Sequence, residues 1–443
     1  MAINGYNKMQ FAKRLNEVVS PARPVISIEN LVGRQKQLER IEKALYAPGR
    51  NIFIYGERGV GKTSLAATAA NQWQSSDSEY IDISCAPDST VRSIVANIAA
   101  QAVRISWTSN NKTIEQATIG FKWLSYSLSN EVSPTDFSEK IKGLSDALEV
   151  LKEVSKIHSA SPIVVVDEVD RMTDDTEIEL LADLLKQIGD KRVELKFIFT
   201  GVGGSLNEIL GAHRSAIRQL ETIELPRLSW DARWDIAIHA LRVFDVEIPE
   251  EIYIRLAAVS DGYPYYVHLI VEKLLWLLFE KEEVVNVVSW DDYYSAVDQA
   301  IVGIAAELAR PYDMAVNQRS QDYEQILWST SADEWQGAYL SDMYQQYTNI
   351  ISQMEDKKVL PYEKFASRIR NLLKPEYGEI LRKGQKQGYY HYKEKMLRGY
   401  IRMQAEANRI EIISKEAKAT IKNYIHVPAK NVGYHKSQLP KGV

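Results

Sequence analysis

The residues with the clearest chemical potential lie in one short stretch, residues 51 to 70, which reads NIFIYGERGVGKTSLAATAA. The central turn fits the pattern G-x-x-x-x-G-K-[ST] at every fixed position: Gly56, Gly61, Lys62 and Thr63. A loop of this kind points successive backbone N–H groups at phosphate oxygens, and the N-terminus of the following helix adds its positive dipole end. The stretch therefore predicts a binding site for a nucleoside triphosphate.

The residues of this loop have separate expected roles. The ammonium group of Lys62 would neutralise the β- and γ-phosphates, and the hydroxyl group of Thr63 would be a ligand of Mg²⁺. The cofactors that the loop predicts are ATP and Mg²⁺. Further contacts with the nucleotide are expected from Gly56, Gly59, Gly61 and Ser64.

A second stretch, PIVVVDEVDR at residues 162 to 171, supplies acidic groups for the same chemistry. Its four apolar residues end in Asp167, which places a carboxylate at the carboxyl end of a buried strand, where Mg²⁺ would be bound. Glu168 follows directly and could polarise the attacking water. For Asp170 and Arg171, a local ion pair and a catalytic role are both open.

A third apolar run, KFIFTGVGG at residues 196 to 204, carries Thr200 near its end. A hydroxyl group at this place could orient the water or contact the γ-phosphate. The alternative is a strand that simply ends at a turn.

The elements that must position these residues alternate between strand and helix, which predicts a parallel sheet covered by helices on both faces. The first helix is expected to begin at Asn30 as its cap. Many β-branched and aromatic residues between 112 and 130 predict a hairpin. From about residue 230 the pattern becomes helical only, and a turn-linked pair of strands follows near residue 385.

The composition limits the class of protein. Cys85 is the only cysteine in 443 residues, which indicates a reducing compartment, and no long uncharged apolar run is present. We therefore expect a soluble, cytoplasmic protein without a membrane segment. The net charge of −5 hides an asymmetry: residues 357–443 carry 20 Lys or Arg against 7 Asp or Glu, while residues 1–356 carry 34 against 52. A basic tail on an acidic body predicts an anionic partner.

The three stretches together, in this order, resemble the AAA+ ATPases, in particular the prokaryotic branch related to origin-recognition and replication-initiator ATPases. The resemblance implies that Val32, Gly33 and Arg34 of ENLVGRQKQLERIEKAL lie near the adenine. It places an arginine finger at Arg218, with Arg214 as the other candidate. In the stretch SDGYPYYVHLIVEKLLW, Pro264 would pack on the nucleotide, in a signature that STAND switch ATPases share. No arginine follows on that helix, which departs from the initiators.

With the resemblance included, the predicted domains can be given as residue ranges. They are a lead-in over 1–25, an ATPase core over 26–228 with a hairpin insertion at 112–130, a helical lid over 229–312, a winged-helix-like domain over 318–410 and a basic tail over 411–443.

The predicted winged helix joins basic and aromatic residues. Lys364, Arg368 and Arg370 lie on or near its third helix, and the segment ILRKGQKQGYYHYKEK would form the wing. Basic groups for phosphates beside aromatic groups for sugars and bases are typical of DNA-binding surfaces. The alternative is a basic face that docks on the acidic body of a neighbouring subunit.

Two functions follow from these expectations. The first is a DNA-associated ATPase that binds and hydrolyses ATP, assembles into homo-oligomers in an ATP-dependent way, and regulates or recruits a partner protein. In this function the basic C-terminal domain would bind double-stranded DNA. The second is a STAND-like switch in which ATP drives the assembly that activates a separate effector, for example in anti-phage defence. A processive motor is a weaker third reading, because no aromatic-hydrophobic-glycine pore loop is present.

Overall fold

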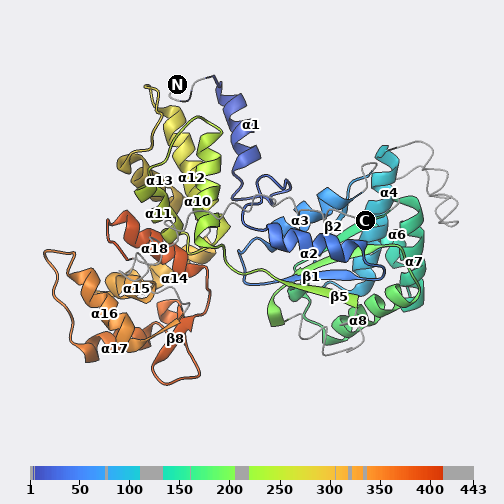
Figure 1. Cartoon of the computed structure of the whole chain (residues 1–443). Coiled ribbons are helices and arrows are strands. Elements are labelled where there is room, and N and C mark those ends of the chain that lie inside the picture. The colour runs from blue at the N-terminus through green and yellow to red at the C-terminus, as the bar shows by residue number, and fades with distance from the viewer. Residues whose placement is uncertain are drawn as a thin grey trace, which may run out of the picture. The chain divides into compact units, whose positions relative to one another are not determined.

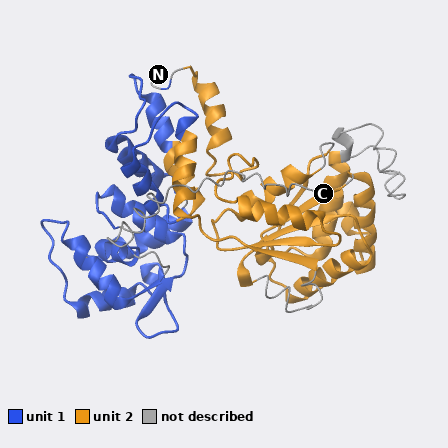
Figure 2. Cartoon of the chain, viewed as in Figure 1, with its two compact units in different colours: residues 1–3, 241–261, 273–443 blue, residues 4–240, 262–272 orange. Residues whose placement is uncertain are grey.

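The structure is a computed structural model of the chain, and it divides the residues into two units (Figures 1 and 2). The sheet unit comprises residues 4–240 and 262–272, and the helical unit comprises residues 1–3, 241–261 and 273–443. The described residues are 3, 5–74, 78–109, 133–159, 161–204, 219–304, 306–317, 322–332 and 337–412, with the backbone alone at 106–109. The predicted hairpin at 112–130 and nearly all of the tail at 411–443 lie outside them.

The elements of the sheet unit are α1 (Lys8–Val18), α2 (Gln35–Tyr46), β1 (Asn51–Tyr55), α3 (Lys62–Trp73), β2 (Ile81–Ser84), α4 (Val91–Ser109), α6 (Pro134–Ser138), α7 (Leu144–Ile157), β3 (Ile163–Asp167), the 3-10 turn η2 (Val169–Arg171), α8 (Asp175–Asp190), β4 (Lys196–Gly201) and β5 (Leu220–Glu224). Two helices begin in this unit and end in the helical unit: α10 (Trp230–Arg242) and α12 (Pro264–Glu280). The elements of the helical unit are α11 (Glu250–Val259), α13 (Trp290–Val302), α14 (Ala306–Val316), α15 (Tyr323–Thr330), β6 (Gly337–Tyr339), α16 (Leu340–Ile351), α17 (Tyr362–Asn371), the 3-10 turn η4 (Pro375–Tyr377), β7 (Leu381–Lys383), β8 (Tyr389–Tyr392) and α18 (Leu397–Ala407).

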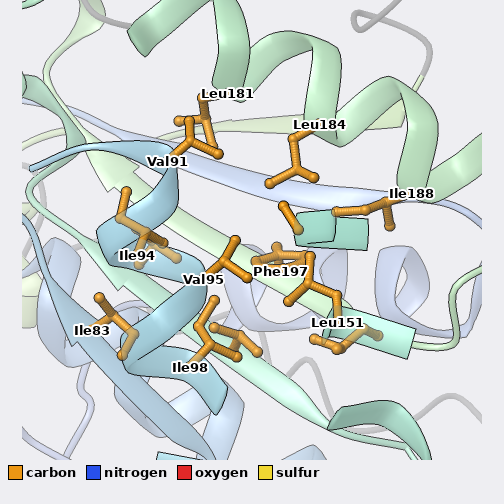
Figure 3. Close-up of a cluster of buried hydrophobic side chains, with 14 of the residues drawn as sticks. Ile83, Val91, Ile94, Val95, Ile98, Leu151, Leu181, Leu184, Ile188 and Phe197 are labelled. Atoms are coloured by element: carbon orange, nitrogen blue, oxygen red, sulfur yellow. The ribbon is translucent and has the colours of Figure 1, made fainter. Parts of the chain in front are cut away.

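The sheet unit is built on five parallel strands in the order β2-β3-β4-β1-β5, which confirms the predicted α/β fold class. Helices α2 and α3 contact the strands β1, β3, β4 and β5, and α4, α7 and α8 pack together with α4 against β2. Alternate side chains of β3 and β4 enter the core shared with α4, α7 and α8. Figure 3 shows part of this core, where Phe197 of β4 lies among apolar side chains that include Val95 and Leu184. Because both faces are covered, the central strands β1, β3 and β4 consist mainly of apolar residues.

The order of the strands brings the carboxyl ends of β1, β3 and β4 to one edge of the sheet. Thr200 on β4 is in register with Ile54 on β1, and Val166 on β3 is in register with Phe199 on β4. The loops that follow these strands therefore meet at the same edge, which is where parallel sheets bind ligands.

The helical unit joins α11 to a winged helix. A three-stranded antiparallel sheet, β6-β8-β7, follows α15 and borders α16 and α17 in the sequence, and this confirms the predicted winged helix. The buried helix α18 contacts α11, α13, α14 and α15. Its Arg398 and Arg402 lie 3.2 and 3.3 Å from the carboxylate of Asp261, and Glu406 lies 2.6 Å from Arg255 on α11.

Three local expectations are wrong. The first helix of the chain is α1, which lies within the expected lead-in. The helix expected at Asn30 is α2, and it begins at Gln35, because Gly33 with φ +74° makes a turn in between and the Asn30 side chain donates to Glu17 O. The spacing of apolar residues predicts one helix over residues 137 to 157, but the structure has two helices there, α6 and α7. Strand β5 has no counterpart among the predicted elements, because its two glutamates hide the apolar signal of a strand at the sheet edge. Among the described helices, none combines the length and apolar character needed to cross a membrane.

Candidate active site

The glycine-rich loop connects β1 to α3, as the sequence predicts. Gly59 and Gly61 have φ of +81° and +95°, a backbone conformation that side chains disfavour. At Gly56 a Cβ atom would lie 2.4 Å from the carbonyl oxygen of Leu225, which follows β5. All three glycines are therefore required by the backbone of the loop itself.

Lys62 is the first residue of α3 and lies against the loop. Its Nζ donates to the carbonyl oxygens of Gly56 at 3.1 Å and Glu57 at 2.9 Å. Burial lowers the pKa of Lys62, and the carboxylates of Asp170 and Asp167 partly oppose this shift. The charge of the ammonium group is therefore stabilised by Asp167, the last residue of β3, and by Asp170, which follows this strand.

Asp167 joins the three stretches that the sequence analysis singled out. Its Oδ2 accepts a hydrogen bond from the hydroxyl of Thr63 at 2.8 Å, and its Oδ1 accepts a short one from the hydroxyl of Thr200. The Thr200 hydroxyl also accepts the backbone N–H of Glu168 at 3.1 Å. Asp167 and Thr200 are both buried. A carboxylate and two hydroxyl groups from three separate elements thus form one connected cluster.

Glu168 has an uncommon backbone conformation. Its φ is +57°, in the left-handed region that costs a residue with a side chain about 1 kcal/mol or more. The strain is held by hydrogen bonds on both sides, because the N–H is bonded to Thr200 and the carbonyl oxygen accepts from Arg171 N at 2.9 Å. The Glu168 carboxylate lies 3.1 Å from the Arg171 guanidinium, and both side chains are half exposed. At this exposure the ion pair contributes at most about 1 kcal/mol.

The segment from Val32 to Arg34 supports the loop from a second side. Gly33 packs so tightly that a Cβ atom there would lie 2.4 Å from the Cβ atom of Ala232. Arg34 is buried and donates to the carbonyl oxygen of Val60, in the loop, at 2.9 Å. Burial lowers the pKa of Arg34 to about 10, so the guanidinium stays charged at neutral pH. Val32, which precedes these two anchored residues, is half buried.

The chain that precedes this segment runs beside α3. The Ser64 hydroxyl accepts the N–H of Val25 at 3.1 Å, and the Thr68 hydroxyl donates to Val25 O at 2.8 Å. The side chain of Asn71 donates to Ile26 O at 3.3 Å. Ser64 is therefore in contact with the lead-in chain, a contact that the sequence pattern does not indicate.

The first turn of α12 lies against the same loop. The Cγ atom of Pro264 is 3.8 Å from the position that a Cβ atom would take on Gly61, so the two are in van der Waals range. One turn later, His268 is buried and its Nδ1 has no hydrogen-bond partner among the described residues. Burial lowers the pKa of His268 to about 4, so its imidazole is neutral at pH 7.

The structure thus brings together the glycine loop, Lys62, Thr63, Asp167, Glu168, Thr200 and Pro264. Two candidates for the arginine finger, Arg214 and Arg218, lie outside the described residues. The sequence analysis places Arg34 near the adenine but does not predict its hydrogen bond to Val60. It also does not predict the close approach of Leu225 to Gly56 or the hydrogen bond, 2.9 Å long, from the Tyr263 hydroxyl to the Glu57 carboxylate.

Comparison with known proteins fits this geometry. Residues 30–198 match the family model described as an AAA ATPase domain. The chain contains an AAA ATPase domain. Such a domain implies ATP hydrolysis, so the chain is an ATPase. No curated protein matches the chain by sequence.

The solved structures that resemble this chain are only distantly similar to it. A Walker-type ATPase of Pyrococcus abyssi is 16% identical with a TM-score of 0.48, and the alignment covers 86% of this chain and 99% of that one. The Orc2 protein of Aeropyrum pernix is 14% identical with a TM-score of 0.47 and coverages of 88% and 98%. The RuvB branch migration motor of Thermotoga maritima is 14% identical with a TM-score of 0.40 and coverages of 88% and 99%. Similarity at this level carries no information about substrate or partner.

Proposed function

We propose that this chain is an ATP-dependent regulator that binds double-stranded DNA through its winged helix, assembles into homo-oligomers when ATP is bound, and recruits or controls a partner protein. The observation that carries the DNA-binding part is the gathering of exposed basic side chains on α17 and on the β7–β8 wing. The ATP-dependent part rests on the AAA ATPase domain and on the cluster around Asp167.

The residues around the loop suit ATP with Mg²⁺. The loop provides backbone N–H groups and Lys62 for the phosphates, and Thr63 and Asp167 provide oxygen atoms, the ligands that Mg²⁺ prefers. Within the described residues, no group of three or more His, Cys, Asp or Glu side chains is arranged to hold a metal ion. Two protein ligands are typical for Mg²⁺ bound together with phosphates. When bound, the ion neutralises charge on the β- and γ-phosphates.

In this proposal the residues in and beside the cluster around Asp167 have different roles. Glu168 would polarise the attacking water, and Asp167 with Thr63 would hold the metal ion. Thr200 is a positioning residue, because its hydroxyl is already bonded to the Asp167 carboxylate and to the Glu168 N–H. It fixes both acids relative to the end of β4.

Replacing Thr200 with valine tests this role. The variant keeps the shape of the side chain but leaves the Glu168 N–H without its partner, so we expect turnover to fall about 10-fold, the scale of one buried hydrogen bond. ATP affinity should stay within a few-fold of the wild type, because the loop is untouched. Thr222→Val, the same change on β5, should leave both unchanged. An unchanged turnover for Thr200→Val would show that the hydroxyl does not position the acids.

The basic residues of the winged helix differ in their surroundings. Lys364 and Arg370 on α17 and Arg382 and Lys383 on β7 are exposed. Arg368 is half buried, with its guanidinium 4.9 Å from the centre of the Tyr323 ring, so it is turned partly toward its own domain. The exposed residues therefore form the candidate phosphate-binding set.

The aromatic residues of the wing contribute less than the sequence pattern suggests. Tyr390 and Tyr392 are 7% and 3% exposed and belong to the core of the winged helix. Tyr389 packs edge to face on the exposed Tyr339, with the ring centres 5.2 Å apart. Only this last pair is available to contact sugars or bases.

If the exposed set contacts phosphates, the affinity for double-stranded DNA should fall steeply with salt. The slope of log K against log salt is about −0.9 for each phosphate contact. Replacing Lys364, Arg370, Arg382 and Lys383 with alanine should therefore make the slope shallower by up to about 3.6 while ATP affinity is unchanged. Fluorescence anisotropy of a labelled duplex at several salt concentrations measures this slope.

The matched control removes the same charge from the other unit, at the exposed residues Lys36, Lys43, Lys142 and Lys191, and should leave the slope as it is. If the winged-helix variant binds DNA normally but no longer assembles with ATP, the basic face is a subunit-docking surface. That result would favour the second candidate, a STAND-like switch that activates a separate effector.

A further inference from the structure

The three-stranded sheet of the winged helix has one buried face. Tyr390 on β8 is paired with Ala338 on β6, and Tyr392 on β8 is paired with Leu381 on β7. All four side chains are buried, and the Tyr392 hydroxyl is hydrogen-bonded to Thr330 on α15. Residues paired across strands, and every second residue along a strand, point to the same face. This face therefore belongs to the core of the winged helix.

The opposite face of the sheet, here called the wing face, carries Tyr339 on β6, Tyr389 and His391 on β8, and Arg382 on β7. Tyr339 is paired with Tyr389, and Arg382 is paired with His391. Tyr339 and Arg382 are exposed, and Tyr389 and His391 are half buried. The wing face therefore presents aromatic rings and a guanidinium group at the surface of the helical unit.

The ring of Tyr389 lies across two glycines of the neighbouring chain segments. A Cβ atom on Gly384, just after β7, would lie 2.5 Å from the Cδ1 atom of the ring, and a Cβ atom on Gly337, in β6, would lie 2.7 Å from its hydroxyl oxygen. Both segments therefore need glycine beneath this side chain. A ring that meets the backbone on both sides lies along the sheet, so that one of its faces is turned outward.

Covering glycines is a structural role in itself, because an aromatic ring over a strand glycine stabilises a sheet. This role accounts for Tyr389 but not for Tyr339, which is 39% exposed and meets the Tyr389 ring with the two ring planes at 73°. It also does not account for Arg382 on the same face or for the exposed Lys383 and Lys386 beside it. Exposed rings bordered by cations match an anionic ligand that has flat rings of its own.

The ligand that combines phosphates with accessible rings is single-stranded DNA. In a duplex each base is stacked between its neighbours, and the grooves present only the edges of the bases. Aromatic side chains stack on bases where the strand is unpaired, and nearby basic groups follow its backbone. The wing face therefore fits unpaired bases better than it fits a groove.

We propose that the wing face binds unpaired DNA bases, which stack on Tyr339 and Tyr389 while Arg382 contacts the adjoining phosphates. This inference rests on the proposed DNA-binding function and narrows its substrate. The exposed Lys364 and Arg370 of α17 bind the phosphates of a duplex, and the wing face binds a strand that has separated from it. The preferred ligand is then a duplex with an unpaired segment, such as a fork.

Two labelled ligands test the proposal with the full chain: a blunt duplex, and the same duplex with an unpaired tail of about ten thymidines on each strand, within the range of single-strand site sizes. We expect the wild type to bind the tailed duplex at least about 10-fold more tightly, on the scale of stacking one base on an aromatic side chain. Tyr339→Ala should remove about 10-fold of affinity for the tailed duplex, so that the ratio of the two affinities approaches one. Fluorescence anisotropy at several salt concentrations measures both affinities.

The salt dependence separates stacking from a damaged wing. Tyr339→Ala removes no charge, so the slope of log K against log salt for the tailed duplex should stay as it is in the wild type. Tyr339 is also the N-cap residue of α16 without a side-chain hydrogen bond to the helix, so alanine costs no cap. Tyr339→Phe keeps the ring and should bind as the wild type does. Tyr46→Ala, at a tyrosine that is 74% exposed in the sheet unit, is the matched control and should have no effect.

The outcomes distinguish this inference from the proposed function. If the wild type binds both ligands equally and with a steep salt dependence, the stacking site is wrong and DNA binding by the winged helix stands. A preference for the tailed duplex that survives in Tyr339→Ala also contradicts the inference, as does a loss in Tyr339→Phe equal to that in Tyr339→Ala. If neither ligand binds, the proposed DNA-binding function falls together with this inference.

Discussion

Replacing Lys62 with alanine is expected to weaken ATP binding by about 100-fold or more. The side chain supplies the main positive charge beside the glycine loop, and charge-assisted hydrogen bonds to phosphate are about twice as strong as neutral ones. Lys62 is partly buried, so water would not readily replace the lost ammonium group. Calorimetry or the fluorescence of a labelled nucleotide measures the loss.

The comparison for this variant is Lys36→Ala, which removes an exposed lysine near the start of α2 and should bind ATP normally. The melting temperature of Lys62→Ala without nucleotide should stay close to that of the wild type. The reason is that the ammonium group bonds only to backbone oxygens of the loop among the contacts described above. Normal ATP affinity in Lys62→Ala would show that the loop is not the nucleotide site.

The parts of the site that could be predicted from the sequence are those that depend on short segments. The loop needs glycine at Gly61 because of its positive φ, and the spacing of the motif fixes a glycine at this position. Asp167 follows four apolar residues, so its place at the carboxyl end of a buried strand is also a local property. The parallel sheet then brings the two together without further information.

The supports of the loop could not be predicted, because each is a contact between distant segments. Arg34 bonds to Val60, and Tyr263 bonds to a residue 206 positions away in the chain. Nothing in the spacing of these residues marks them as partners. Strand β5 is also not predicted, because it lies at the edge of the sheet. An edge strand tolerates glutamates, and the two glutamates of β5 weaken its apolar pattern.

In the winged helix, the sequence pattern predicts more residues that contact DNA than the burial of those residues allows. The run Tyr389–Tyr392 reads as an aromatic wing, but side chains in a strand alternate between two faces. Tyr390 and Tyr392 therefore point into the core, and Tyr392 bonds to Thr330 there. The alternation was available in the sequence, but which of the two faces is buried depends on packing against α15.

Replacing Glu168 with glutamine is expected to lower ATP turnover by about 100-fold or more while ATP affinity is preserved. A general base contributes on the order of 10² to 10⁴ to the rate, and an amide cannot take the proton of the attacking water. The amide has the shape of the carboxylate, and the backbone of Glu168 is held by Thr200 and Arg171, so the site should keep its form. Phosphate release under saturating ATP measures the turnover.

The ion pair between Glu168 and Arg171 leads to a related prediction. In the structure the Glu168 carboxylate lies 3.1 Å from the Arg171 guanidinium. This ion pair must break before the carboxylate can polarise a water molecule. Because the pair is half exposed and weak, Arg171→Ala should change turnover by only a few-fold, and in the upward direction. The control Glu179→Gln, on the exposed face of α8, should have no effect. If Glu168→Gln turns over ATP at the wild-type rate, a different residue positions the water, and the neighbouring Asp170 becomes the next candidate, because its charge acts on Lys62.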